Sequence, residues 1–303
     1  MAKPFYYGGQ AVIEGVMMRG KDKVAVCVRR PDGKLELISQ SLASIYKGRF
    51  REIPLFRGII VLIESLVLGT QALFRSAEIA SAEEEEEKMS PVLLWGTVAI
   101  GIAFAVALFF IAPLFITRSL IDPYISSVLL SNIAEGFIRI GVFIAYLKVI
   151  GLMPEIKRVF AYHGAEHKVV NGYEAGVPLE VEAVKNYSTA HARCGTGFIF
   201  IVLIIAIFVF SLVGRPSLWL SVLSRIVLLP VIAAIGYEVM KFGAAHIGNK
   251  VVHILLAPGL ALQNLTTREP DDSQLETAIS ALNEVTKNDQ VVESDCDYRI
   301  LQE

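Results

Sequence analysis

The stretch PVLLWGTVAIGIAFAVALFFIAPLFI, residues 91–116, decides the fold class because it contains no charged side chain. An α-helix needs about 20 apolar residues to cross the hydrocarbon core of a bilayer, so this stretch predicts a transmembrane span. The composition agrees: 54% of the residues are hydrophobic, only 19% are charged, and the mean hydropathy is +0.54. We therefore predict a mainly α-helical, polytopic membrane protein.

Three more segments are apolar and long enough to be spans: residues 133–153, 197–213 and 217–240. The first of them contains Glu135 and Arg139, which are four residues apart and can pair on one helix face. With residues 91–116, these segments predict about four transmembrane helices.

Two other apolar segments, 55–80 and 244–261, are interrupted by charged residues or histidines. We expect 55–80 to be an amphipathic helix that lies at the membrane interface or covers the helix bundle. We expect 244–261 to be an interfacial or re-entrant helix that ends at Pro258-Gly259. His246 and His253 are seven residues apart and would share one face of this second helix.

The ends of the chain are more polar. Alternating residues in 24–30 and 34–40 flank Pro31-Asp32-Gly33 and predict a β-hairpin, and residues 10–18 predict a third strand. Leu275, Ile279 and Leu282 form one stripe of an amphipathic helix over 273–285. The acidic tail after Asn288 is expected to be disordered.

These segments divide the chain into four parts. Residues 1–54 form a small cytoplasmic β-rich element, and residues 55–90 form the amphipathic helix and an acidic linker that includes Glu83–Glu87. Residues 91–265 form the four-span membrane domain with the cytoplasmic loop 154–196. Residues 266–303 form a cytoplasmic amphipathic helix and an acidic tail.

The distribution of lysine and arginine predicts the orientation. The loop 154–196 carries five of these residues, whereas the loops 118–132 and 214–216 carry one each. Cytoplasmic loops are enriched in positive charge, so the loop 154–196 is expected in the cytoplasm. Four spans then place both termini in the cytoplasm as well.

The loop 154–196 contains His163-Gly164-Ala165-Glu166-His167, in the H-x-x-E-H order of inverted zinc metalloproteases. On a helix both imidazoles and the carboxylate lie on one face. We expect His163 and His167 to bind a divalent metal, with zinc the expected ion. Glu166 is then the expected general base, taking the proton of a metal-bound water. The alternative is that the two histidines are polar caps on a cytoplasmic helix, since short motifs also match by chance.

Other residues could complete the coordination. His191 and Cys194 are three residues apart just before the third span; we favour His191, because a single buried cysteine more often serves packing. Glu238 ends the fourth span on the cytoplasmic side and is the expected further ligand, although it could instead pair with Lys241 or Arg193. Arg193 is expected to bind an anionic headgroup or phosphate of a substrate.

Four motifs carry a resemblance to a known family: Tyr7–Arg19, Tyr162–Lys168, Arg193–Thr196 and Gln263–Pro270. On these motifs the chain resembles the YqhQ-like bacterial membrane proteins, whose members are described as predicted metal-dependent enzymes. The resemblance implies a bacterial inner-membrane location and a metal, but no substrate. Proline often follows the family's equivalent of His191; here Ala192 stands there, which loosens the local turn.

The leading functional hypothesis is a metal-dependent hydrolase at the cytoplasmic membrane boundary. Its expected partners are membrane lipids and a membrane-embedded or lipid-linked substrate; the chain contains no nucleic-acid motif. One alternative is a transporter or channel, favoured by the polar span residues Glu135, Arg139, Arg225 and Glu238. The other is a non-catalytic scaffold with a structural metal.

The topology is directly testable. We predict that a reporter fused after Asn288 lies in the cytoplasm and that one inserted near Ser126 lies outside, because positive charge is concentrated in the loop 154–196. Paired alkaline phosphatase and green fluorescent protein fusions measure both positions. A C-terminus outside the cytoplasm would overturn the count of four spans.

Overall fold

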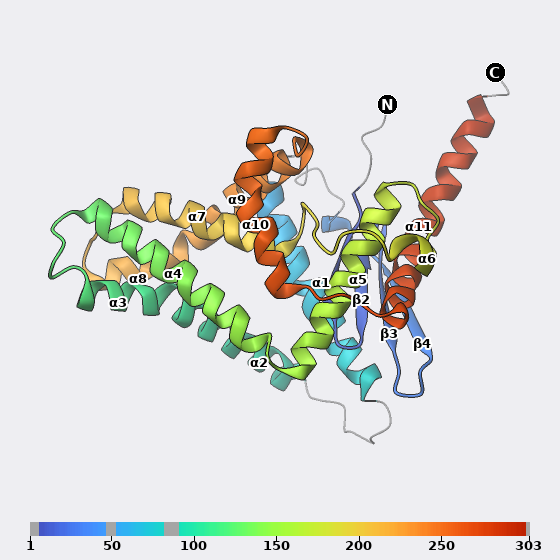
Figure 1. Cartoon of the computed structure of the whole chain (residues 1–303), viewed down its shortest axis with the longest axis horizontal. Coiled ribbons are helices and arrows are strands. Elements are labelled where there is room, and N and C mark those ends of the chain that lie inside the picture. The colour runs from blue at the N-terminus through green and yellow to red at the C-terminus, as the bar shows by residue number, and fades with distance from the viewer. Residues whose placement is uncertain (1–5, 47–52, 82–90, 301–303) are drawn as a thin grey trace.

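The computed structural model describes residues 6–46, 53–81 and 91–300. A small sheet covered by helices lies at one end of the molecule, and long apolar helices extend away from it (Figure 1). The predicted acidic linker at Glu83–Glu87 lies outside the described residues.

The sheet has four antiparallel strands, which pair in chain order: β1 (Gly8–Val12), β2 (Gly15–Arg19), β3 (Lys23–Arg29) and β4 (Leu35–Ser41). The predicted hairpin is confirmed, because β3 and β4 pair with Val26 opposite Ile38. Gly33 in the connecting turn has a φ of 84°, a backbone conformation that favours glycine.

The prediction of a single strand over residues 10–18 is wrong. The chain turns back at Ile13-Glu14 and forms two strands, with Ala11 paired to Val16. Glu14 takes a positive φ of 49° at this turn. The apolar residues on both sides of so tight a turn resemble one strand in the sequence, and only the pairing separates them.

Helices cover both faces of the sheet. One face packs against α5 (Pro154–Glu174) and α11 (Asp272–Ile300), and the other against α1 (Phe56–Ala80). Met18 and Ala25 point to the first face, whereas Met17 and Val24 point to the second. Because side chains alternate along a strand, each helical layer meets its own apolar surface, which so small a sheet could not bury alone.

Helix α11 confirms the predicted amphipathic segment. Leu275, Ile279 and Leu282 are all buried in the core with α5 and the sheet. The helix continues to Ile300, so the backbone after Asn288 is helical where disorder was predicted. No proline or glycine interrupts this segment, so nothing in its sequence ends the helix early.

Three of the four predicted spans correspond to long apolar helices. The first comprises α2 (Pro91–Val106), the π-helical turn Ala107–Ile111 and α3 (Ala112–Leu120); the next two are α4 (Val128–Ile150) and α7 (Gly195–Val213). By length and composition all three could cross a membrane, and so could α1. The second half of α1 packs on the sheet and its first half packs on α9.

The fourth predicted span is not one continuous helix. It is divided into α8 (Leu218–Val227) and α9 (Leu229–Ala245), which meet at an angle of 43°. Pro230 lies in the first turn of α9; it has no N–H to continue the hydrogen bonds of α8, which explains the break.

The predicted helix 244–261 is also different in the structure. Helix α9 ends at Ala245, and α10 (Lys250–Thr266) begins after a turn and continues through Pro258. His246 therefore caps α9 while His253 lies on α10, so the two histidines do not share a helix face. Two short helical turns complete the described elements: Ser44–Tyr46 and α6 (Val181–Val184).

Candidate metal centre

Two histidines of α5 lie on one face of the helix and are both oriented by backbone carbonyls. The rings of His163 and His167 are 4.4 Å apart between centroids. His163 Nδ1 donates to the Thr266 carbonyl at 2.8 Å, and His167 Nδ1 donates to the Thr189 carbonyl at 2.6 Å. A carbonyl oxygen only accepts, so each Nδ1 carries a proton and each Nε2 of a neutral ring is left as an acceptor. Metal-binding histidines are held in this way.

Cys194, the residue that caps α7, adds a third ligand atom. Its Sγ lies 3.3 Å from His163 Nε2, and one ligand atom of each of His163, His167 and Cys194 lies within 4.8 Å of the others. Ligand atoms of a tetrahedral zinc site are about 3.3–3.6 Å apart, given bonds of about 2.0–2.3 Å. The distance between His163 Nε2 and Cys194 Sγ is in this range, whereas the 4.8 Å limit on the whole group is wider; nitrogen and sulfur are donors that zinc prefers.

Glu166 lies beside this group and is only 5% exposed. Its Oε1 accepts a hydrogen bond from the Gly9 N–H at 3.0 Å, and its Oε2 is 3.5 Å from His167 Nε2. A carboxylate and a neutral imidazole nitrogen are both acceptors, so this contact is favourable only when a cation or a proton lies between them. Strand β1 thus holds one oxygen of Glu166 and leaves the other near the histidines.

The structure includes Cys194 in the group rather than the preferred His191. The His191 ring lies 5.7 Å from the His167 ring between centroids, and its Nε2 is 3.6 Å from Glu174 Oε2. The backbone N–H and carbonyl of His191 both bond the side chain of Gln263, at 2.8 and 2.9 Å. This pair of hydrogen bonds fixes the loop that carries Cys194.

Arg193 is engaged within the chain. Its guanidinium pairs with Glu174 and stacks over the Tyr6 ring at 4.4 Å. Burial raises the pKa of the Glu174 carboxyl, but the hydrogen bonds with His191 and Arg193 and the charge of Arg193 outweigh it, and the pKa lies below its usual range. Glu174, His191 and Arg193 thus form an ion-pair group beside His163, His167 and Cys194.

Glu238 is not brought to the histidines. Both of its carboxylate oxygens accept hydrogen bonds from Arg57 on α1, and Oε1 also accepts from the Leu55 N–H. Glu238, the expected metal ligand, instead forms an ion pair with Arg57 that joins α1 to α9. Arg57 precedes Glu238 by 181 residues, so only the packing of these helices shows that they are partners.

Gly164, inside the histidine motif, allows another backbone to approach α5. A Cβ at this position would lie 2.1 Å from the Arg268 carbonyl oxygen. The Arg268 N–H also donates to the Phe160 carbonyl at 2.9 Å. The segment after α10 therefore lies against α5, which brings the Thr266 carbonyl to His163.

Four positioning residues were not predicted: Gly9, Thr189, Gln263 and Thr266. Gly9, Gln263 and Thr266 lie within motifs on which the family resemblance rests, whereas Thr189 lies in none of them. Their contributions are a backbone N–H, a side-chain amide and two backbone carbonyls, and none of these can be identified as site groups from residue type.

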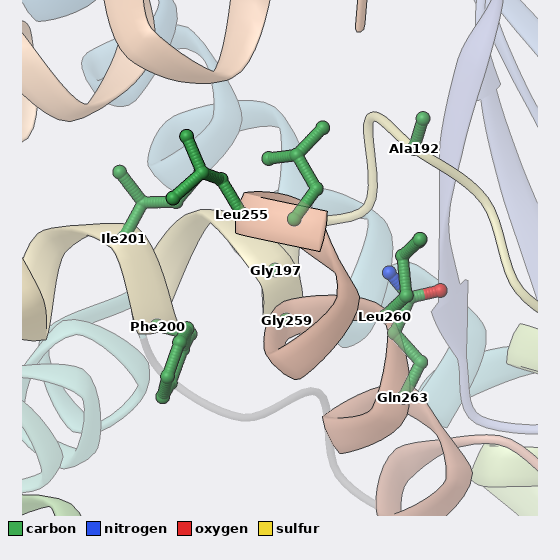
Figure 2. A pocket seen from close by; sticks show the side chains of 9 residues that line it. Ala192, Gly197, Phe200, Ile201, Leu255, Gly259, Leu260 and Gln263 are labelled. Carbon is green, nitrogen blue, oxygen red and sulfur yellow. The ribbon is translucent and has the colours of Figure 1, made fainter. Parts of the chain in front are cut away.

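A small apolar pocket adjoins the site (Figure 2). It lies between the first half of α7 and the second half of α10, and Ala192 and Gln263 form part of its wall. Phe200, Ile201 and Leu255 supply apolar surface. Gln263 thus lines the pocket and also holds His191.

Comparison with known proteins identifies the family. A profile described as "Protein of unknown function (DUF1385)" matches residues 53–288, which is most of the chain, so the chain belongs to this family. It is similar to the "Uncharacterized protein YqhQ" of Bacillus subtilis (strain 168), with 37% identity over 302 residues that cover 94% of this chain and 93% of that protein. No solved structure matches the chain. The predicted resemblance is confirmed as family membership.

We predict that Gly164→Ala destabilises the protein, because the added methyl group cannot fit against the Arg268 carbonyl. Overpacking of this kind costs about 1–3 kcal/mol, and the midpoint of thermal unfolding should fall by several degrees. Gly195→Ala is the matched control, since a Cβ there meets nothing within 4 Å. Equal midpoints for the two variants would contradict the close approach.

Proposed function

We propose that this chain is a multi-pass membrane protein with a metal-dependent hydrolytic site, built from His163, His167, Cys194 and Glu166. One observation carries the proposal: both histidines commit Nδ1 to a carbonyl, so that two imidazole acceptor atoms converge beside the Cys194 sulfur, which binds a metal once its thiol proton is lost. Three protein ligands leave one coordination position free, which is the pattern of catalytic rather than structural zinc sites.

Each residue has a distinct role in this proposal. His163, His167 and Cys194 hold the ion, while Glu166 accepts the proton of the attacking water. A bound divalent ion polarises the substrate carbonyl or phosphoryl group and lowers the pKa of coordinated water. The Gly9 N–H donates to the Glu166 carboxylate and keeps it oriented, whereas a flexible glutamate on the surface would have no such fixed orientation.

The packing also supports the topology. The N-terminal sheet, α5 and α11 share one hydrophobic core, so they must lie on the same side of any membrane that the long helices cross. The chain must therefore cross the membrane an even number of times between the sheet and α5, and again between α5 and α11. Two crossings in each interval meet this requirement: α2–α3 and α4 in the first, and α7 and the bent pair α8–α9 in the second. A full crossing by α1 would make the number in the first interval odd.

The neighbouring pocket favours an apolar substrate group. Its wall joins residues of α7 and α10 to the loop that carries Cys194. The pocket measures about 20 Å³, so it has room only for a small apolar group of a substrate. Together with the long apolar helices beside it, the pocket supports our proposal of a membrane-embedded or lipid-linked substrate.

The metal can be measured without a substrate. We predict about one transition-metal ion per chain, most of it zinc, in detergent-purified protein analysed by elemental mass spectrometry. His163→Ala, His167→Ala and Cys194→Ser should each lose most of the metal, because each removes one of three ligands. His253→Ala is the matched control, since His253 is on α10 outside the group. Full retention in a His163/His167 double variant would refute the centre.

Glu166→Gln separates proton transfer from metal binding. We predict that it keeps the metal, because Glu166 is outside the group of three ligands, but fails to complement a null strain, because an amide cannot accept the proton. Glu238→Gln should keep both metal and complementation, since Glu238 pairs with Arg57. Full complementation by Glu166→Gln would rule out the hydrolytic mechanism.

A second candidate function uses the same atoms without a metal. The 3.3 Å contact of Cys194 Sγ with His163 Nε2, and the bond of His163 Nδ1 to the Thr266 carbonyl, match a nucleophile, a base and an orienting group. This second function, that of an acyl-transferring thiol enzyme, requires that the protein bind no metal. Chelator treatment distinguishes the two, because a metal-free thiol enzyme retains function while the metal-dependent hydrolase loses it.

A further inference from the structure

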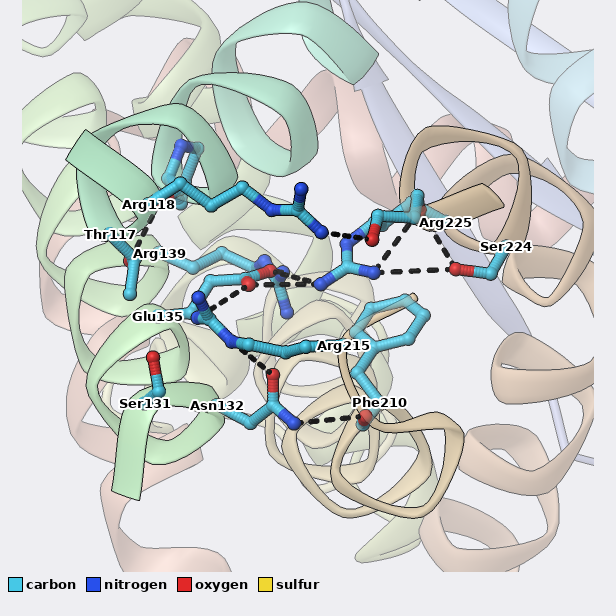
Figure 3. A network of polar contacts seen from close by, with 12 residues as sticks. Thr117, Arg118, Ser131, Asn132, Glu135, Arg139, Phe210, Arg215, Ser224 and Arg225 are labelled. Atoms are coloured by element: carbon cyan, nitrogen blue, oxygen red, sulfur yellow. Dashed lines mark hydrogen bonds and ion pairs between the residues drawn. The ribbon is translucent and has the colours of Figure 1, made fainter. Parts of the chain in front are cut away.

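A second polar group lies among the long helices, at the end of the molecule remote from the sheet (Figures 1 and 3). Arg118 is on α3, Arg139 on α4 and Arg225 on α8, and Arg215 lies in the turn between α7 and α8. These four arginines come together although the helices around them are apolar. None of these groups belongs to the candidate metal centre.

Glu135 is shared by three of the arginines. Its Oε1 accepts from Arg139 at 2.6 Å, and its two oxygens accept from Arg225 at 3.0 and 2.9 Å. Arg215 Nη2 lies 3.7 Å from Glu135 Oε2, which is beyond hydrogen-bond distance. The side chains of Arg139, Arg225 and Glu135 are only 1–2% exposed, so these three side chains are buried from solvent.

Arg118 and Arg215 lie nearer the surface. Arg215 pairs with Asp122, and its side chain is 11% exposed. Arg118 donates to the Pro216 carbonyl at 2.6 Å and to the Ser221 hydroxyl at 2.7 Å, and both of these acceptors are neutral. Because Pro216 follows Arg215 and the Ser221 carbonyl accepts from Arg225, these contacts link the outer arginines to the inner ones.

The charges in this group do not balance. Four guanidinium groups face two carboxylates, Glu135 and Asp122, so the group carries two positive charges in excess, and Arg118 has no ion-pair partner among the described residues. Among the described residues, Arg118 Nε, Arg215 Nη2 and Arg225 Nε are buried and have no hydrogen-bond acceptor. Uncompensated charge is costly in a low-dielectric interior, so a bound anion would stabilise this arrangement.

We propose that this arginine cluster, Arg118, Arg139, Arg215 and Arg225, is a binding site for a phosphate-type oxyanion. The oxygens of a phosphate accept the forked N–H donors of arginine in pairs, and arginine keeps its charge when buried. The oxyanion enters at Arg118 and Arg215, which lie nearer the surface, while the more deeply buried Arg139 and Arg225 supply positive charge. A free phosphate and the phosphodiester of a lipid headgroup present this same chemistry.

The outer arginines give the clearest test. Isothermal titration of detergent-purified full-length protein with inorganic phosphate, against chloride as a blank, should show saturable binding. Arg118→Gln and Arg215→Gln should each weaken it about tenfold or more, which is the effect of losing a charge-assisted hydrogen bond. Arg75→Gln is the matched control, because Arg75 is 59% exposed and its ion pair among the described residues is with Glu78 on the same helix.

Two more variants exclude a purely structural network. Asp122→Asn should tighten phosphate binding several-fold, because it removes a negative charge that competes with the ligand for Arg215. Arg118→Lys should retain most of the binding, because it keeps the charge. If Asp122→Asn weakens binding, or if Arg118→Gln binds like Arg75→Gln, the site does not exist.

Lipid nanodiscs distinguish the two sources of the ligand. Saturable binding of inorganic phosphate in detergent indicates a soluble oxyanion. A lipid headgroup is the ligand if three results are obtained together. Phosphate does not bind, phosphatidylglycerol raises the midpoint of thermal unfolding while phosphatidylcholine does not, and Arg118→Gln abolishes the increase. No response to either compound would overturn the proposal. The His163/His167 double variant should bind the anion normally, so failure of the metal centre does not affect this test.

Discussion

The burial of a polar helix is the constraint on which the rest of the structure depends. Helix α5 lies between the sheet, α11 and the segment after α10, yet its buried face carries Glu166, His167 and Lys168. A buried polar group is tolerated only when it has a partner. The Gly9 N–H, the Thr189 carbonyl and the Lys185 carbonyl are those partners, so satisfying α5 also fixes strand β1 and the loop before α7.

The molecule has two polar centres of opposite character. Near the sheet, the Nε2 atoms of His163 and His167 and the Glu166 carboxylate are acceptors, and the Cys194 thiol is the one proton donor among these four groups, which favours a cation. At the remote end, guanidinium groups outnumber carboxylates and three buried N–H groups lack acceptors, which favours an anion. In both places the imbalance between donors and acceptors, rather than any single residue, indicates the ligand.

The sequence predicted the elements best where one physical signal dominated. The charge-free stretches 91–116 and 197–213 and the stripe of α11 are helices as expected, because continuous or periodic hydrophobicity has few other solutions. The errors came where local chemistry is ambiguous. The turn at Glu14 was hidden inside an alternating pattern, and Pro230 and Pro258 had opposite outcomes, one dividing a span and one lying within a helix.

The sequence by itself determined the histidine spacing, because i and i+4 share a face of any helix, and so it identified His163, His167 and Glu166 together. Only the tertiary structure decided their neighbours. Cys194 adjoins them while Glu238 pairs with Arg57, because the Gln263 amide holds the loop of Cys194 and the packing of α1 on α9 brings Arg57 to Glu238. Local periodicity is a property of a segment, whereas these contacts join residues 31 to 181 positions apart and exist only once the helices have packed.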